Sequence, residues 1–156
     1  MSDGVKVIAR NRKASYEYQL GERYEAGLVL TGSEIKSIRA NKINLQDGFV
    51  QEQNGELWLL NVHITPYDHS GTYGYTEPLR ARKLLLHKKQ IAQIIGRIRE
   101  RGMTVIPTQV YLKNGRAKVE IALAKGKKLY DKRADIAKRD SEREIRKVMK
   151  AGRYED

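Results

Sequence analysis

The residues that could carry out chemistry are few, and their spacing fits no common catalytic or metal site. The three histidines, His63, His69 and His87, do not form a zinc motif such as H-E-x-x-H, and the chain contains no cysteine. Residues 124–128 (AKGKK) lack the first glycine and the final Ser or Thr of a phosphate-binding P-loop. No serine lies in the glycine-rich turn of a hydrolase nucleophile. The sequence therefore indicates a binding protein rather than an enzyme, with no metal and no cofactor.

Basic side chains, by contrast, are numerous and point to a polyanionic partner. The chain has 31 Lys and Arg residues against 19 Asp and Glu, a formal net charge of +12. A positive field of this size attracts nucleic acid, an anionic membrane or an acidic protein. The basic residues recur in clusters, which are Arg10, Arg12 and Lys13, then Lys36, Arg39 and Lys42, then Arg80, Arg82 and Lys83. Each charge can contact a phosphate and release counterions, so the recurrence favours nucleic acid.

Three tyrosines lie near the first basic cluster and have two candidate roles. Tyr16, Tyr18 and Tyr24 could stack on RNA bases. Packing inside the fold is the alternative, and we favour it for most of the nine tyrosines.

Length and composition indicate one folded domain in a reducing compartment. A chain of 156 residues, 40% of them hydrophobic, can bury one sizeable core. It has no apolar run near the roughly 18 residues of a membrane helix, and its first residues lack the apolar stretch of a signal peptide. The absence of cysteine fits a reducing environment. We therefore expect a cytoplasmic protein without a membrane partner. We also expect a monomer, although nothing in the sequence excludes a dimer in the absence of RNA.

Short β-like runs occupy most of the chain before residue 124 and would position the basic clusters. Apolar and polar residues alternate over residues 5–10 and 14–20, and residues 24–30 and 84–86 form short apolar runs. Asn54-Gly55 and Asn114-Gly115 are strong two-residue hairpin turns. They join strands predicted at residues 49–53 with 56–64, and 103–112 with 116–123. This pattern predicts a mainly β fold, a small OB-like antiparallel barrel, with a sandwich as the alternative.

One or two helices are predicted to flank this barrel. Residues 31–34 (TGSE) form a capping-box pattern, and Ile35 and Ile38 follow at helical spacing, so the first helix should end near Asn41. The second helix carries four isoleucines at i, i+3, i+4 and i+7, which are Ile91, Ile94, Ile95 and Ile98. Gly102 follows as a natural stop.

The composition changes after residue 124 and predicts a separate tail. Residues 125–156 hold 12 Lys or Arg and 7 Asp or Glu, a net charge of +5 (12 − 7), and few apolar residues. Such a segment has helical propensity but too little apolar surface to pack on a core. We predict a barrel over residues 1–124. The basic tail, 125–156, should be disordered when free and helical from about Lys132 on an acidic receptor.

Seven stretches resemble one known family. They are residues 11–14 (NRKA), 24–27 (YEAG), 34–40 (EIKSIRA), 44–50 (NLQDGFV), 64–67 (ITPY), 82–87 (RKLLLH) and 124–133 (AKGKKLYDKR). Together they resemble small protein B, the tmRNA-binding (SsrA-binding) family of bacterial ribosome rescue, in order over about residues 5 to 150. A general basic RNA-binding or ribosomal protein would explain the charge but not these ordered motifs. A nuclease or RNA-modifying enzyme lacks a site.

The resemblance implies a fold, a set of partners and a mechanism. It implies an OB-like barrel that binds the tRNA-like domain of tmRNA. It also implies delivery of alanyl-tmRNA, with elongation factor Tu and GTP, to the vacant A site of a stalled ribosome. The tail would then enter the empty mRNA path beside small-subunit rRNA, so that decoding proceeds without a codon and the stalled peptide is tagged.

The resemblance also implies two sets of site residues. The tmRNA-facing set is Glu25, Leu85 and His87, joined by Asn11, Arg12, Lys13, Arg39 and Lys118. The set at the decoding centre and mRNA path is Gly126, Lys127, Lys128 and Tyr130, followed by Asp131, Lys132 and Arg133. The sequence departs from the family at Ser15 and Tyr16, where Arg and His are common.

Overall fold

Strands dominate the chain and alternate with a few helices. The structure, a computed structural model, describes residues 4–66, 77–101 and 103–126. In these ranges the elements are β1 (Val5–Arg10), α1 (Ala14–Glu17), β2 (Tyr18–Leu28), α2 (Gly32–Arg39), β3 (Ile43–Asn44), β4 (Phe49–Gln53), β5 (Glu56–Leu60), β6 (His63–Ile64), β7 (Arg82–Leu85), α4 (Lys88–Arg101), β8 (Thr104–Lys113) and β9 (Arg116–Gly126).

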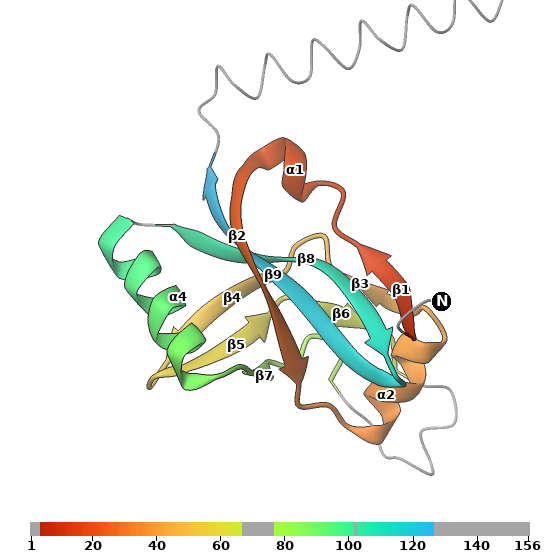
Figure 1. The fold of residues 1–156 in the computed structure, drawn as a ribbon. Helices are drawn as coiled ribbons and strands as arrows, with labels where there is room; N and C mark the ends of the chain where they lie inside the picture. Colours follow the sequence, from red (N-terminus) through yellow and green to blue (C-terminus); the bar gives the residue numbers. More distant parts are fainter. Residues whose placement is uncertain (1–3, 67–76, 102, 127–156) are drawn as a thin grey trace, which may run out of the picture.

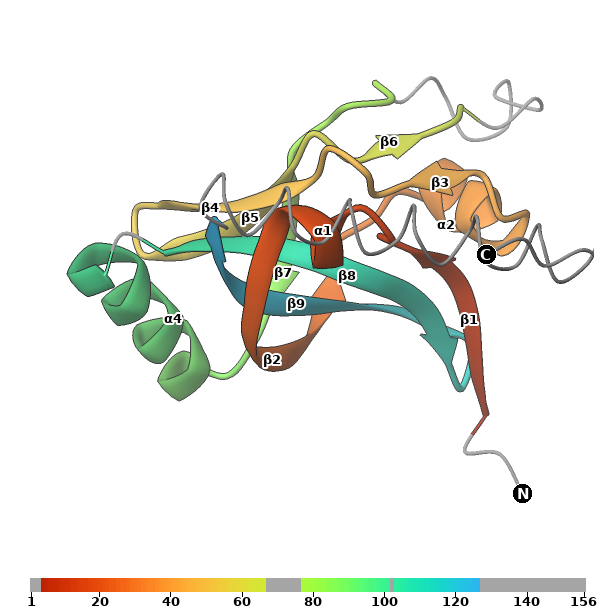
Figure 2. The same ribbon diagram turned by 90° about the horizontal axis from the view of Figure 1, so that it is seen from above.

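The main sheet closes on itself. Its strand order is β1-β8-β4-β5-β7-β2-β9, and an additional pairing of β8 with β9 joins the two ends into a ring, with β1 attached outside. Every pairing is antiparallel. Figures 1 and 2 show the strands wrapped around a common interior, with α4 and α2 at opposite ends of the barrel. The predicted mainly β, OB-like barrel with flanking helices is confirmed.

Asparagine residues with positive φ mark the turns of the barrel. Asn54 and Gly55 have φ of 54° and 78°, and Asn114 and Gly115 have φ of 51° and 81°, which fits the two-residue turn that matches strand twist. Both predicted hairpins are therefore confirmed. Asn61, with φ of 61°, ends the second strand of the first hairpin. The single strand predicted over residues 56–64 is thus divided into β5 and β6.

The two longer helices close the ends of the barrel with isoleucine side chains. Ile94 of α4 and Ile38 of α2 are fully buried in the main core cluster, and the other isoleucines of α4 pack partly against it. The helical spacing read from the sequence therefore predicted the correct face of α4. Because both ends are closed, ligands must approach the outer face of the barrel or a hollow in its wall.

The strand predicted over residues 14–20 is wrong in its first half. Ala14–Glu17 forms the single helical turn α1, and β2 begins only at Tyr18. The backbone N–H groups of Tyr16 and Glu17 donate to the carbonyl of Lys13, at 3.1 and 3.2 Å. Ala14 is buried against Ile106. A period of two over so few residues could not distinguish this turn from a strand.

The last strand runs further than predicted. β9 continues to Gly126, which pairs with Tyr18 of β2. The first two residues of the predicted tail therefore extend the barrel sheet. The rest of that segment, residues 127–156, lies outside the described residues, as does Gly102, the predicted stop of the second helix.

Helix α2 begins with the predicted capping box and carries a buried ion pair. The Glu34 N–H donates to Thr31 Oγ1 (3.2 Å), and the Thr31 N–H donates to Glu34 Oε1 (2.9 Å). Arg82 Nε donates to Glu34 Oε2 at 2.6 Å. Burial alone would raise the pKa of Glu34, but hydrogen bonds from Arg80, the Thr31 backbone and Arg82 hold it below its ordinary value. The carboxylate therefore stays ionised inside the fold.

One predicted RNA-facing cation is in fact a core residue. Arg82 is 0% exposed, and besides Glu34 it donates to the carbonyls of Val62 (2.6 Å) and Pro78 (3.0 Å). A phosphate cannot reach it. The prediction that the third basic cluster contacts phosphates is therefore wrong for Arg82, whose ion pair with Glu34 joins α2 to β7 instead.

Replacing Thr31 with alanine is expected to lower the free energy of unfolding by about 1 kcal/mol, because the first turn of α2 loses its side-chain acceptor. Urea denaturation would measure the change. Thr31→Ser keeps the hydroxyl and should stay near the wild type. An equal loss in both variants would mean that the methyl group, not the cap, stabilises this turn.

Candidate nucleic-acid interface

Cross-strand register brings predicted tmRNA-facing residues that are distant in the sequence onto one outer face of the barrel. Gly27 of β2 lies opposite Leu85 of β7 on one side and opposite Lys118 of β9 on the other. Lys118 in turn lies opposite Tyr111 of β8. Directly opposed residues share a sheet face, with Cβ atoms about 5 Å apart. Leu85, Lys118 and Tyr111 therefore form one continuous row across four strands.

A second row runs parallel to the first, two residues along each strand. Glu25 of β2 lies opposite Glu120 of β9, Glu120 opposite Gln109 of β8, and Gln109 opposite Arg10 of β1. We call the surface made by these two rows the sheet face. It places the predicted residues Glu25, Leu85 and Lys118 together, although they are far apart in the sequence.

Glu25 is held in place by two neighbours on the sheet face. Tyr111 donates its phenol O–H to Glu25 Oε2 at 2.5 Å, and Lys113 Nζ lies 3.5 Å from the same oxygen. The Tyr111 hydrogen bond lowers the pKa of Glu25, partial burial opposes it, and the charges of Lys113 and Lys118 lower it further. Among the described residues both partners use Oε2, which leaves Oε1 for a donor from outside.

The pKa of Tyr111 shifts in the opposite direction to that of Glu25. Burial raises the pKa of the Tyr111 phenol above its ordinary value, and the hydrogen bond to Glu25 adds to the rise. The phenol therefore keeps its proton at every physiological pH, and it acts as a fixed donor to the carboxylate.

Glu120, the other carboxylate of the sheet face, is fully engaged with its neighbours. Its Oε1 accepts from Arg23 (2.8 Å) and from Thr108 (2.7 Å), and its Oε2 accepts from Gln109 (3.1 Å). Burial would raise the pKa of Glu120, but these hydrogen bonds lower it. Since both oxygens have protein donors, Glu120 stabilises the sheet, whereas Glu25 keeps Oε1 without a donor among the described residues.

An apolar side chain borders the charged part of the sheet face. Leu85 is 51% exposed, and it covers Gly27, where a Cβ atom would lie 3.3 Å from the Leu85 Cβ. An exposed leucine beside a carboxylate and two lysines gives the face a contact for the apolar surface of a base or ribose. The short apolar run at residues 84–86 is thus split, with Leu84 buried and Leu85 outside.

Two further predicted residues lie at the margins of the sheet face. Arg39, at the end of α2, donates to the carbonyl of Gly115 in the β8–β9 turn (3.4 Å), which brings it to the Lys118 end of β9. His87 follows Leu85 beyond β7 and is exposed. Its backbone N–H donates to Gln90 Oε1 (3.2 Å) and its carbonyl accepts from the Ile91 N–H (3.0 Å), so it is the residue immediately before α4 and its carbonyl accepts a hydrogen bond from the first turn.

The remaining predicted residues lie elsewhere. Asn11, Arg12 and Lys13 connect β1 to α1, beside the upper end of β2 in Figure 1, whereas β2 meets β7 at its lower end. Asn11 is fixed there by hydrogen bonds from Nδ2 to the carbonyls of Pro107 (3.0 Å) and Leu45 (3.3 Å). Gly126 is the last described residue. The rest of the predicted ribosomal set lies outside the described residues, namely Lys127, Lys128, Tyr130, Asp131, Lys132 and Arg133.

Sequence reasoning missed the residues that orient Glu25. Tyr111 and Lys113 lie on β8, and Tyr111 is 86 residues away from Glu25 in the chain. The signal was present in the alternation of β8, where Val110 faces the core and Tyr111 and Lys113 face the other way. Reading it required the register between β8, β9 and β2, which the sequence does not state.

The described ranges hold neither a metal-binding cluster nor a membrane-spanning helix. In residues 4–66, 77–101 and 103–126, no group of three or more His, Asp or Glu side chains is placed to hold a metal ion. No helix in this part of the chain is long and apolar enough to cross a membrane.

Comparison with known proteins places these observations in a family. The family model described as SmpB protein matches residues 8–151. The SsrA-binding protein of Desulforudis audaxviator is 57% identical over 145 residues, which cover 93% of this chain and 94% of that protein. The SsrA-binding protein of Nostoc punctiforme is 54% identical over 150 residues, covering 96% and 97% of the two chains.

A solved structure shows the same fold. A chain of the structure described as "tmRNA-SmpB: a journey to the center of the bacterial ribosome" is 42% identical to this one, with a TM-score of 0.64. The match covers 78% of this chain and 85% of that chain. With a family model that spans most of its length and relatives above half identity, this chain belongs to the SmpB protein family.

Proposed function

We propose that this protein is the RNA-binding adaptor of trans-translation. It binds the tRNA-like domain of tmRNA and delivers alanyl-tmRNA, with elongation factor Tu and GTP, to the vacant A site of a stalled ribosome. It acts in the cytoplasm, as a monomer, and carries out no chemistry of its own. The barrel supplies the tmRNA surface, and the segment after Gly126 acts in the empty mRNA path.

One observation carries the tmRNA part of this proposal. Glu25, Leu85 and Lys118 come from three separate sequence stretches, and the register of β7, β2 and β9 places them side by side on the sheet face. Unlike Glu120, whose two oxygens are bound by protein donors, Glu25 keeps one oxygen without a donor among the described residues, and Leu85 is half exposed. RNA with folded loops is recognised through such combinations of cations, apolar contacts and acceptors for base amino groups or 2′-hydroxyls.

Each residue of the sheet face has a distinct role in this proposal. Lys118 and Lys113 offset phosphates. Leu85 packs on a base or ribose. Glu25, which cannot bind a phosphate, accepts a hydrogen bond at Oε1 from a base amino group or a 2′-hydroxyl, with its other oxygen held by Tyr111. Arg39 and His87 extend the contact at the two margins, and Asn11, Arg12 and Lys13 contact RNA at the other end of β2.

A competition assay separates this function from general RNA binding. The tRNA-like domain of tmRNA and bulk tRNA would compete for the protein at a stated salt concentration. We expect strong preference for the tRNA-like domain. Equal competition would support a general basic RNA-binding or ribosomal protein and would contradict the adaptor role.

Replacing Tyr111 with phenylalanine is expected to weaken binding to the tRNA-like domain about tenfold. The variant keeps the buried ring but loses the hydrogen bond that fixes the Glu25 carboxylate, a contact to a charged group worth about 1.5 kcal/mol. Filter binding would measure the change. Tyr24→Phe is the matched control, because Tyr24 also donates to a carboxylate, Glu22 Oε2, at 2.8 Å. Equal losses in both variants would contradict a specific role for Tyr111.

A further inference from the structure

A hollow lies in the barrel wall, away from the Glu25 end of the sheet face, and of its lining residues only Asn11 and Lys13 have a role in the function proposed above. It has a volume of about 380 Å³, within the range of small-molecule sites. It is formed where the β1–α1 connection meets the start of β2, the loop before β4 and the start of β8. That loop is part of the 44–50 stretch (NLQDGFV), which the family resemblance covers and the tmRNA surface does not use.

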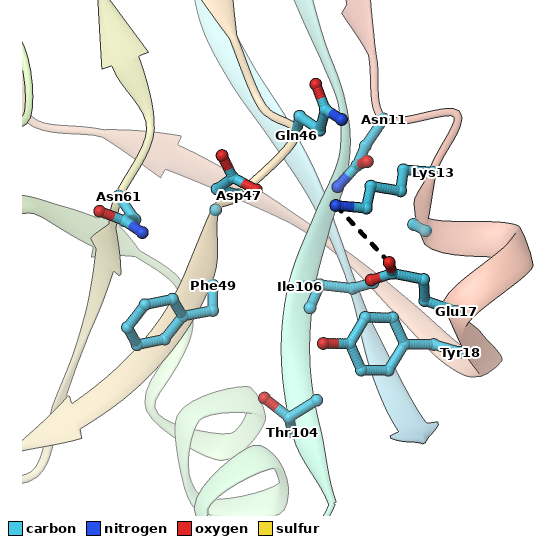
Figure 3. Close-up of a pocket in the computed structure, with 12 residues that line it drawn as sticks. Asn11, Lys13, Glu17, Tyr18, Gln46, Asp47, Phe49, Asn61, Thr104 and Ile106 are labelled. Atoms are coloured by element: carbon cyan, nitrogen blue, oxygen red, sulfur yellow. Dashed lines mark ion pairs between the residues drawn. The ribbon is translucent and has the colours of Figure 1, made fainter. Parts of the chain in front are cut away.

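Two aromatic rings stand on opposite sides of this pocket. Figure 3 shows Phe49 on one wall and Tyr18 on the other, with Asp47 and Gln46 along the rim between them. Phe49 is 37% exposed, although the next residue, Val50, is buried in the core. A planar group between the two rings would cover the exposed ring of Phe49 on one face and the half-buried ring of Tyr18 on the other. Base–aromatic stacking is the common use of such a pair in RNA-binding proteins.

The polar lining is rich in acceptors. Asp47 and Glu17 place carboxylates at the pocket. Asn11 commits its amide nitrogen to two backbone carbonyls, which leaves its Oδ1 buried in the pocket wall with no donor among the described residues. An acceptor left without a donor is costly. A ligand that brings an N–H donor would find an open acceptor in the exposed carboxylate of Asp47, because Glu17 is paired with Lys13 and Asn11 Oδ1 has almost no exposed surface.

The same lining argues against an anion. Lys13 is the one cation of the pocket lining in the part of the chain that the structure describes, and its Nζ is paired with Glu17 Oε1 at 3.5 Å, the contact drawn in Figure 3. A phosphate inside the pocket would therefore meet carboxylates. Arg12 is exposed on the β1–α1 connection, where it can hold a phosphate that flanks an inserted base.

The pocket is built into the fold rather than formed by a loose loop. A Cβ atom on Gly48 would lie 2.6 Å from Val62 Cγ2 and 2.9 Å from Pro107 Cγ, so only glycine allows the loop to press this closely on the barrel. The Gly48 N–H donates to the carbonyl of Leu45 (2.9 Å), and Leu45 is buried in the core. The walls are therefore fixed before any ligand arrives.

We propose that this pocket binds an unpaired RNA base that carries an exocyclic amino group, stacked between Tyr18 and Phe49. The inference rests on the proposed function only in taking RNA as the partner. The pocket is separate from the Glu25 end of the sheet face, so both sites can be occupied together. Asp47 accepts from the amino group, and cytosine satisfies this requirement where uracil, with a carbonyl at the same position, does not.

The test compares oligocytidylate with oligouridylate of equal length, using the full chain and fluorescence anisotropy. Contacts of the basic tail with phosphates are equal for the two probes, so their affinity ratio reports the base pocket. We expect about tenfold preference for cytidine, lost in Asp47→Asn. Phe49→Ala should weaken cytidine binding about tenfold, whereas Phe49→Trp should retain it. Tyr18→Ala should also weaken cytidine binding, because it removes the second ring of the pocket. Tyr16→Ala, which removes a tyrosine ring that does not line the pocket, is its control and should bind cytidine like the wild type.

The results separate this inference from the proposed function. Equal affinity for the two probes, or wild-type binding by Phe49→Ala, would overturn the pocket assignment. The same variants are also measured against the tRNA-like domain of tmRNA. If the wild-type protein shows no preference for that domain, the proposed function fails, and the cytidine-to-uridine ratio still decides the pocket.

Discussion

Raising the salt concentration from about 50 to about 200 mM is expected to lower the affinity for the tRNA-like domain about a thousandfold. This is the effect of roughly six phosphate contacts, if counterion release from duplex DNA is a guide. The sheet face and its margins offer enough cations: Arg10, Arg23, Arg39, Lys113, Arg116 and Lys118. Arg82, which the sequence suggested as another, does not count because it is buried.

Single substitutions locate these contacts. Lys118→Ala is expected to reduce the slope of log affinity against log salt by about one, the share of one phosphate contact. Arg99→Ala is the control with the same loss of charge. Arg99 lies on α4, where its guanidinium pairs with Glu52 at 2.9 Å, and it should leave the slope unchanged. A flat salt response in the wild type, or equal slopes for Lys118→Ala and the wild type, would contradict the proposed face.

Features set by a few adjacent residues were predictable from the sequence. The two Asn-Gly turns, the capping box at Thr31 and the isoleucine face of α4 were each predicted and are confirmed. In each case the physical cause is local. An Asn-Gly pair tolerates positive φ, a threonine caps a free N–H three residues later, and a period of 3.6 defines a helix face.

Features set by distant residues were not predictable in the same way. The closure of the barrel depends on β8 pairing with both β9 and β4, and the Glu25–Tyr111 hydrogen bond follows from the register of β8, β9 and β2. Arg82 shows the limit most clearly. Its alternation with Leu84 places it on the inward face of β7, but basic residues are so seldom buried that the charge was read as exposed. Glu34, its partner, lies 48 residues away.

The candidate site depended on the family resemblance more than on physical patterns. Charge alone indicated nucleic acid, but it could not distinguish cations available to RNA from cations paired with carboxylates inside the protein. Glu25 and Leu85 have no feature in the sequence that marks them as ligand contacts. The structure supports them because an oriented carboxylate and an exposed leucine occur together on the sheet face.

Replacing Asp131, Lys132 and Arg133 together with alanine is expected to abolish peptide tagging on stalled ribosomes and to leave tmRNA binding near normal. These residues lie outside the described part of the chain, and the expectation comes from their sequence. β9 ends at Gly126 beside Tyr18, so the segment starts at the edge of the barrel and at a distance from Glu25. It can therefore reach a second partner while the sheet face holds tmRNA.

The composition of this segment suits a channel lined by rRNA. From Lys138 onward, basic residues recur mostly at steps of three to four, at Lys138, Arg139, Arg143, Arg146, Lys147 and Lys150. A helix would spread them around most of its circumference. Acidic residues form pairs at i, i+4, such as Asp135 with Arg139 and Glu142 with Arg146, each of which stabilises a helix by a few tenths of a kcal/mol. Positive charge on all sides lets the helix contact phosphates on every wall of the channel.

The same stretch provides a matched control for position against charge. Lys138, Arg139 and Asp140 contain the same three residue types as Asp131, Lys132 and Arg133, so their replacement by alanine changes net charge equally. We expect this control to retain more tagging than the first variant, because only residues 131–133 follow the 126–130 segment assigned to the decoding centre. Tagging in a reconstituted translation system, and binding of the tRNA-like domain by filter assay, would be measured for both. Wild-type tagging in the first variant would exclude the tail as the substitute for a codon. An equal loss in both would show that net charge, rather than position, is what the ribosome requires.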